Sequence, residues 1–71
     1  MSGFSEQLQS LIAESGKSQN QISAELGIRK QKLSKWKRGY NEPNISELIL
    51  IARYFGVTVD YLVGAGNDGA L

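Results

Sequence analysis

The sequence predicts an all-α fold, a compact five-helix bundle. Apolar residues recur at the three- and four-residue spacing of helical faces, glycines follow these stretches where helices would end, and no stretch shows the alternation of a strand. A chain of 71 residues makes one domain, near the lower size at which an apolar core alone stabilises a fold. We place this domain at residues 1–64 and expect the glycine-rich residues 65–71 to form a flexible C-terminal tail.

The first two helices are predicted from their apolar faces and their caps. The first is expected over residues 4–15 and ends at Gly16. The second follows Ser18, whose hydroxyl is expected to form a capping box with the side chain of Gln21, and it ends at Gly27. The core residues expected in these helices are Phe4, Leu8, Leu11, Ile12, Ile22 and Leu26.

A third helix, starting at Arg29 or Lys30 and running to Arg38, follows the second after a turn of about three residues. So short a link makes the two helices meet at a steep angle, which is the geometry of a helix-turn-helix. On a helical wheel Leu33 and Trp36 fall on one side, so we expect them to anchor this helix to the core.

Two further helices are expected after the loop at residues 39–43. Asn44 and Glu47 are spaced as a second capping box and open a helix that runs to about Phe55. Thr58 then caps a short helix that ends before Gly64. The inward face of the fourth helix is expected to comprise Leu48, Ile51, Ala52 and Phe55.

The formal net charge of +1 hides a strongly polarised distribution. Six of the eight Lys and Arg residues lie within residues 29–38, and no acid occurs between Glu25 and Glu42. A charge run on a helix is usually a solvated face, but such a face normally mixes signs to gain ion pairs one turn apart. We therefore favour a nucleic-acid contact for this set: Arg29, Lys30, Lys32, Lys35, Lys37 and Arg38.

The residue types of the third helix suit the major groove of double-stranded DNA. Lysine can donate to the O6 and N7 acceptors of guanine, and the amide of Gln31 matches N6 and N7 of adenine. For Gln19 and Gln31, an ordinary exposed amide is an equal alternative when the residues are taken alone. We therefore expect base reading from this helix. We expect phosphate contacts from Gln19, Arg29, Arg38, Tyr40, Asn41 and Asn44.

Residues 19–38 resemble the helix-turn-helix motif of the lambda-repressor and Cro-like family, also called the XRE family. The motif residues are Gln19, Ser23, Gly27, Leu33 and Trp36. Residues 38–62, with Arg38-Gly39, Pro43, Leu48, Ile51-Ala52, Phe55-Gly56-Val57 and Asp60-Tyr61-Leu62, are similar to the later part of that family. The resemblance implies a five-helix bundle that binds an operator as a homodimer, with base reading from Lys30, Gln31, Lys32 and Lys35. We expect a transcriptional regulator, in particular a repressor of phage or bacterial type.

Three positions depart from the family pattern. Lys37 stands where the family usually has Glu, so we expect the ion pair between helices that relatives share to be absent. Ser23 stands where Ala is common, and its hydroxyl needs a backbone acceptor if it is buried. Arg29 replaces the usual Ser or Thr at the start of the third helix and leaves that helix without a side-chain cap.

Some apolar residues lie off the expected core face and suggest a homodimer contact. These residues are Leu50 and Tyr54, with Tyr61 and Leu62 of the last helix. A dimer would place two copies of the third helix about 34 Å apart, one turn of DNA, so the expected operator is a pseudo-palindrome.

Several function classes find no support. The chain contains no cysteine and no histidine, and its carboxylates and serines form no catalytic constellation, so we expect no enzyme activity, metal, cofactor or small-molecule ligand. No apolar run suits a membrane span or a signal peptide, so we expect a cytoplasmic, nucleoid-associated protein. The alternative is a protein-interaction module on the same fold, such as an antitoxin or an antirepressor partner.

Overall fold

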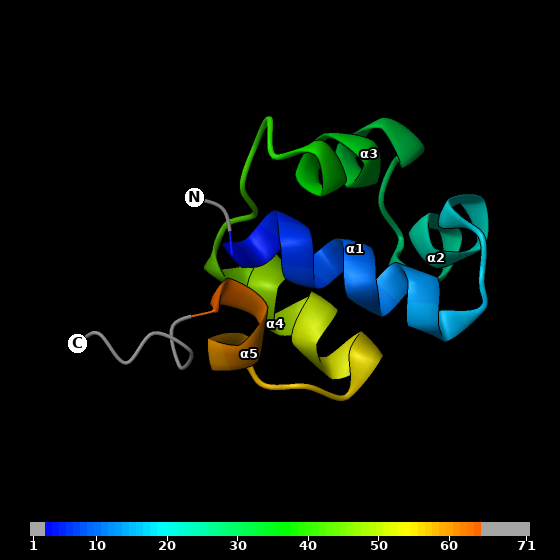
Figure 1. The fold of residues 1–71 in the computed structure, drawn as a ribbon. Coiled ribbons are helices and arrows are strands. Elements are labelled where there is room, and N and C mark those ends of the chain that lie inside the picture. Colours follow the sequence, from blue (N-terminus) through cyan, green and yellow to red (C-terminus); the bar gives the residue numbers. More distant parts are fainter. Residues whose placement is uncertain (1–2, 65–71) are drawn as a thin grey trace.

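The computed structural model describes residues 3–64, and these form five helices without a strand (Figure 1). None of these helices is long and apolar enough to cross a lipid bilayer. The predicted all-α bundle is therefore confirmed, while the tail expected at residues 65–71 lies outside the described residues. The helices are α1 (Gly3–Ser15), α2 (Gln19–Leu26), α3 (Lys30–Arg38), α4 (Ile45–Phe55) and α5 (Val59–Val63).

Helix α1 is the central element of the bundle. It contacts α3 on one side and α5 on the other, and in Figure 1 it lies between α3 above and the α4–α5 pair below. Helix α2 contacts both α3 and α4, so it links the helices on the two sides of α1. As a result α3 packs on the body along one side only and keeps its other side on the outside.

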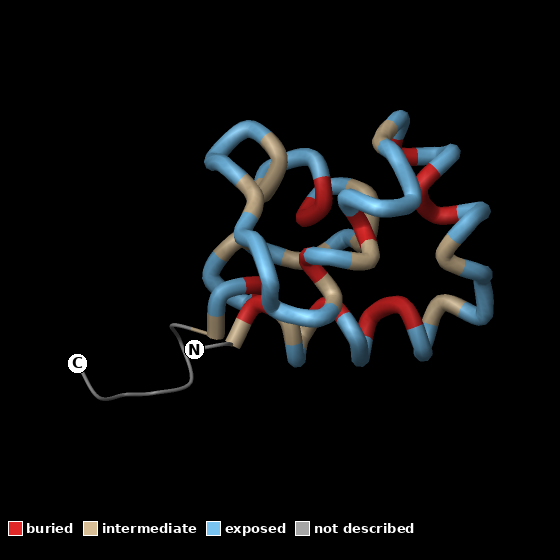
Figure 2. Tube along the Cα trace, turned by 90° about the horizontal axis from the view of Figure 1, so that it is seen from above, coloured by how far each residue is buried: buried red, intermediate tan, exposed pale blue. Residues whose placement is uncertain are grey.

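The core draws apolar side chains from all five helices, and buried and exposed positions alternate along the helices as amphipathic segments require (Figure 2). The core predicted for the first three helices is confirmed. In α4, however, Leu48 and Phe55 are only partly buried and pack against the edge of the core. The buried residues are Phe4, Leu8, Leu11, Ile12, Ile22, Leu26, Leu33, Trp36, Ile51, Ala52 and Leu62.

The helix starts follow the predicted caps with one exception. The Asn44 and Glu47 side chains form the full capping box at the start of α4. At α2 the Ser18 hydroxyl accepts a hydrogen bond from the backbone N–H of Gln21, as predicted. The Gln21 amide does not complete this box, because it donates instead to the carboxylate of Glu25 one turn further on.

The turn between α2 and α3 depends on Gly27. This residue has φ of 76°, a left-handed conformation that side chains with a Cβ rarely adopt, and its N–H donates to the carbonyl of Ala24. The next N–H, that of Ile28, donates to the carbonyl of Ser23. These two bonds end α2 abruptly and allow α3 to start after a short turn.

Two of the four residues expected at a homodimer contact are placed differently by the structure. The expectation for Leu62 is wrong, because this side chain is fully buried as the core anchor of α5. Tyr54 packs partly against the core, and its hydroxyl donates to Glu25 within the same chain. Leu50 and Tyr61 remain exposed, each at 42% of its accessible surface.

Candidate nucleic-acid interface

Helix α3 is held by the two predicted anchors. Leu33 is fully buried and Trp36 is 2% exposed. The indole of Trp36 meets the ring of Phe4 edge to face, with 6.3 Å between centroids, a preferred arrangement for aromatic pairs. The opposite side of α3 carries the exposed side chains of Lys30, Gln31, Lys35 and Arg38.

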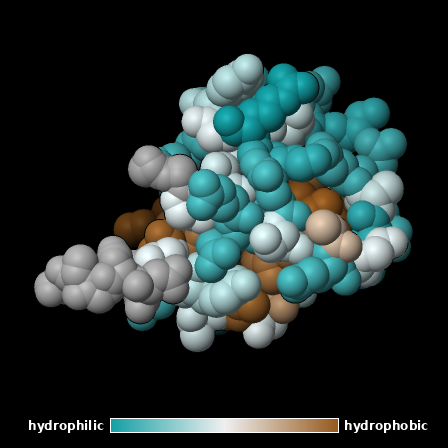
Figure 3. Space-filling view, viewed as in Figure 1, coloured by the Kyte–Doolittle hydropathy of each residue, from teal (hydrophilic) through white to brown (hydrophobic). Residues whose placement is uncertain are grey.

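The surface over α3 is predominantly hydrophilic, as the top of the molecule in Figure 3 shows. No side chain caps the start of α3, since Arg29 makes no such hydrogen bond, as predicted. Lys35, Lys37 and Arg38 occupy the last turn, where cations interact favourably with the helix carbonyls. The positive charge at the C-terminal end of α3 therefore stabilises the helix.

An open depression lies beside the exposed side of α3 and gathers residues from three segments. The α2–α3 turn, α3 itself and the loop after α3 all contribute to its wall. It brings together three of the four candidate base readers and two of the candidate phosphate contacts. The lining residues are Gly27, Ile28, Arg29, Gln31, Lys32, Lys35 and Asn41.

Two more candidate phosphate contacts lie at the C-terminal end of α3. The guanidinium carbon of Arg38 is 5.8 Å from the centroid of the Tyr40 ring, within the range of a cation–π contact. Tyr40 itself is 68% exposed. The pair extends the basic surface beyond the end of the helix.

Lys32 has a counter-charge that the sequence did not suggest. Its ammonium group lies 2.5 Å from the carboxylate of Glu47, at the start of α4, and 5.8 Å from the centroid of the Trp36 ring. The Lys32 hydrogen bond, with a further one from the backbone N–H of Asn44, lowers the pKa of Glu47 below its ordinary value. The lack of acids around residues 29–38 in the sequence therefore does not leave Lys32 without a counter-charge, because an acid from another helix reaches it.

Lys37 and Gln19 form a second link between helices that sequence reasoning missed. The ammonium group of Lys37 donates to the side-chain oxygen of Gln19 over 2.8 Å. The backbone carbonyl of Lys37 in turn accepts a hydrogen bond of 2.8 Å from the amide of Gln9 on α1. The sequence did mark position 37, where Lys37 replaces the Glu of the family, but from this we predicted only the loss of an ion pair and not the bond to Gln19.

Ser23 and Asn44 have structural partners that bear on their expected roles. Ser23 is buried and its hydroxyl donates to the carbonyl of Asn20, so the backbone acceptor that the sequence required is present. The side-chain oxygen of Asn44 accepts from the N–H of Glu47. Since a phosphate accepts hydrogen bonds, a contact by Asn44 would come from its amide nitrogen, and the cap fixes where that nitrogen points.

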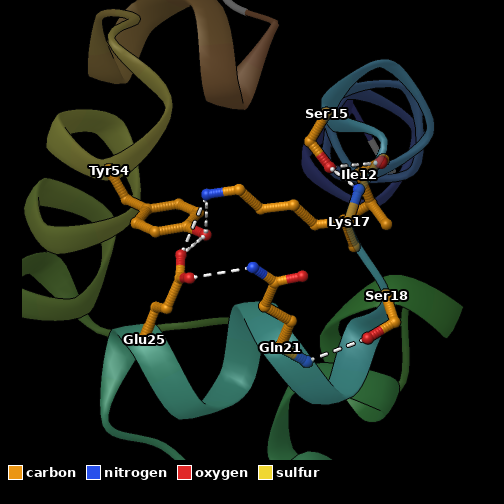
Figure 4. A network of polar contacts seen from close by, with 7 residues as sticks. All are labelled: Ile12, Ser15, Lys17, Ser18, Gln21, Glu25 and Tyr54. Atoms are coloured by element: carbon orange, nitrogen blue, oxygen red, sulfur yellow. Dashed lines mark hydrogen bonds and ion pairs between the residues drawn. The ribbon is translucent and has the colours of Figure 1, made fainter.

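A polar network outside the α3 surface connects the segment before α2, α2 itself and α4 (Figure 4). The carboxylate of Glu25 accepts hydrogen bonds from the Tyr54 hydroxyl, the Lys17 ammonium group and the Gln21 amide. These three donors, that of Tyr54 first, lower the pKa of Glu25 from 4.5 to about 2. No sequence pattern indicated this network, which ties α2 to α4 and so supports the scaffold on which α3 sits.

The chain is similar to several known regulators. It is 35% identical over 60 residues to the HTH-type transcriptional activator BcrR of Enterococcus faecalis, covering 84% of this chain and 29% of that protein. A transcriptional regulator from Listeria innocua has a similar structure, with a TM-score of 0.79 and 34% identity, covering 86% of this chain and 57% of that one. The SOS-response transcriptional repressor LexA from Eubacterium rectale has a TM-score of 0.81 and 33% identity, covering 84% of this chain and 64% of that one.

This chain thus spans less than two thirds of each of these relatives. The model of a helix-turn-helix family matches residues 8–62, a range that includes the α2–α3 turn and both anchors of α3. From this match and the structural similarity to transcriptional regulators, the chain belongs to the XRE family of helix-turn-helix proteins.

Proposed function

We propose that the chain binds double-stranded DNA sequence-specifically in transcription control, with α3 in the major groove. One observation carries this proposal: α3 buries Leu33 and Trp36 and presents lysine, arginine and glutamine side chains on its exposed side. A major groove about 12 Å wide accepts a helix that is anchored along one side in this way. The family match supports the same function.

Base reading is assigned to Lys30, Gln31 and Lys35, which are exposed on α3. Lys32, the fourth candidate, is paired with Glu47 and is therefore not assigned to base reading. Phosphate contacts, which fix the register of the protein on DNA without reading sequence, are assigned to the surrounding side chains. These are Gln19, Arg29, Arg38, Tyr40, Asn41 and Asn44.

We further propose that two copies bind a pseudo-palindromic operator, with α3 helices about one turn of DNA apart. Leu50 and Tyr61 are the exposed residues assigned to the contact between copies. The direction of control proposed is repression, since a protein bound over a promoter excludes polymerase without further contacts. The relatives include one named as an activator and one named as a repressor.

Selection of binding sites from random duplexes, followed by affinity measurements over a range of salt, tests this function. We expect an enriched sequence with two inverted half-sites. If each copy neutralises about four phosphates, a fourfold rise in salt should weaken each half-site by roughly a hundredfold. No enriched sequence and no salt-dependent binding would contradict DNA binding and favour a protein-interaction module.

A further inference from the structure

We propose that Glu47 limits the affinity of the chain for DNA by holding Lys32 away from the phosphate backbone. This inference rests on the proposed DNA binding and adds a residue outside the helix-turn-helix to it. Neutralising Glu47 should release Lys32 and strengthen binding to all duplexes.

The geometry makes the Glu47 carboxylate a fixed acceptor. One of its oxygens accepts from the backbone N–H of Asn44 over 2.9 Å, and the other accepts from Lys32 over 2.5 Å. The first bond belongs to the capping box of α4, so the carboxylate is held in place whether or not Lys32 is near. Lys32 is therefore drawn toward α4 by an acceptor whose position the fold already determines.

The pair lies at the edge of the proposed DNA surface. The Lys32 side chain is 47% exposed and lines the depression beside α3, together with Gln31 and Lys35. The Glu47 side chain is 20% exposed. Of the two ion pairs among residues 3–64, this is the one that includes a residue of α3.

An anion at this position has two effects on a polyanion. It occupies a cation that would otherwise neutralise a phosphate, and its own charge repels the backbone. Each neutralised phosphate contributes about 0.9 to the slope of log affinity against log salt. The Asn44 hydrogen bond to the Glu47 side chain and the cap of α4 do not depend on Lys32, so releasing the ion pair should leave the fold intact.

The test compares wild type with Glu47→Gln, because glutamine also serves at this position of a capping box. At about 0.1 M salt, where charges are screened beyond roughly 10 Å, we expect Glu47→Gln to bind both selected and random duplexes several-fold more tightly. The slope of log affinity against log salt should become steeper by about 0.9. Lys32→Ala should cost more affinity in the Glu47→Gln background than in wild type, since only there is the ammonium group released.

Glu14→Gln is the matched control. It makes the same change in net charge, but Glu14 is an exposed residue of α1 that lines a different depression, with Lys17 and Tyr54. Its affinity and salt slope should stay near those of wild type. Thermal unfolding and the emission of Trp36, next to Lys32, verify that each variant is folded. Glu47→Ala, which keeps the Asn44 cap, replaces Glu47→Gln if the latter fails to fold.

Equal behaviour of Glu47→Gln and Glu14→Gln, with wild type binding DNA, overturns the inference and leaves the proposed function intact. Wild type that binds no duplex overturns both. A readout without DNA separates the pair itself from its consequence: the pKa of Glu47, followed by NMR, should rise toward its ordinary value in Lys32→Ala. No rise would mean that the pair does not form, and the inference would be lost on that ground.

Discussion

Lys37 donates a hydrogen bond to the side-chain oxygen of Gln19 over 2.8 Å and thereby joins the last turn of α3 to the first residue of α2. Because this bond fixes the oxygen of the Gln19 amide, it also fixes where the amide nitrogen, the donor of this group, points. In the proposed function Gln19 contacts a phosphate, and a phosphate accepts hydrogen bonds. In that function we expect Lys37 to act as a positioning residue that orients Gln19.

A double-mutant cycle should detect this orientation. Gln19→Ala should lower the affinity for all duplexes by about twofold to tenfold, because one hydrogen bond contributes roughly 0.5–1.5 kcal/mol. Lys37→Met keeps the aliphatic chain but removes the donor, and its effect should be smaller in the Gln19→Ala background than in wild type. Additive effects would show that the two residues act independently. Affinity for selected and random duplexes is the measurement.

Substitutions on the exposed side of α3 should separate base reading from anchoring. Gln31→Ala and Lys35→Ala should each cost about 1–3 kcal/mol on the selected site and relax the preference at one base position. Arg38→Ala should instead lower the affinity for selected and random duplexes alike. Competition binding with single-base variants of the site measures both. A uniform loss for Lys35→Ala would move this residue to the phosphate contacts.

The low pKa of Glu25 predicts a loss of stability in acid. Its pKa is about 2 in the folded chain, against an ordinary 4.5, so the folded state favours the charged form. The resulting stabilisation is fully present above about pH 5 and is lost as the pH falls through 4.5 toward 2. Thermal unfolding of wild type and Tyr54→Phe should therefore differ at pH 6 and converge near pH 2. A difference that persists in acid would contradict this role of the Tyr54 hydroxyl.

Self-association should depend on the exposed residues of α4 and α5. We expect Leu50→Asp combined with Tyr61→Asp to shift sedimentation toward the monomer, because charges placed in an apolar contact are costly to bury. Ala13→Asp, at an exposed position of α1, is the control and should leave sedimentation unchanged. Unaltered association of the double variant would place the contact elsewhere.

The helices and the orientation of α3 could be predicted from local patterns of residues. Helix caps act within a few residues, so they can be predicted before the fold is known. This holds for the caps at Ser18, Asn44 and Thr58 and for the turn at Gly27. The apolar seam of Leu33 and Trp36 is equally local, and it decides which side of α3 faces outward.

The contacts between side chains of different helices could not be predicted in this way. Lys32 and Glu47 are 15 residues apart, Lys37 and Gln19 are 18 apart, and Tyr54 and Glu25 are 29 apart. Such pairs depend on how separate helices pack, which periodicity does not specify. The same reason accounts for Leu62. The sequence predicts a short helix at this residue but not the packing of that helix, and the contacts of α5 with α1 and α4 place the side chain in the core.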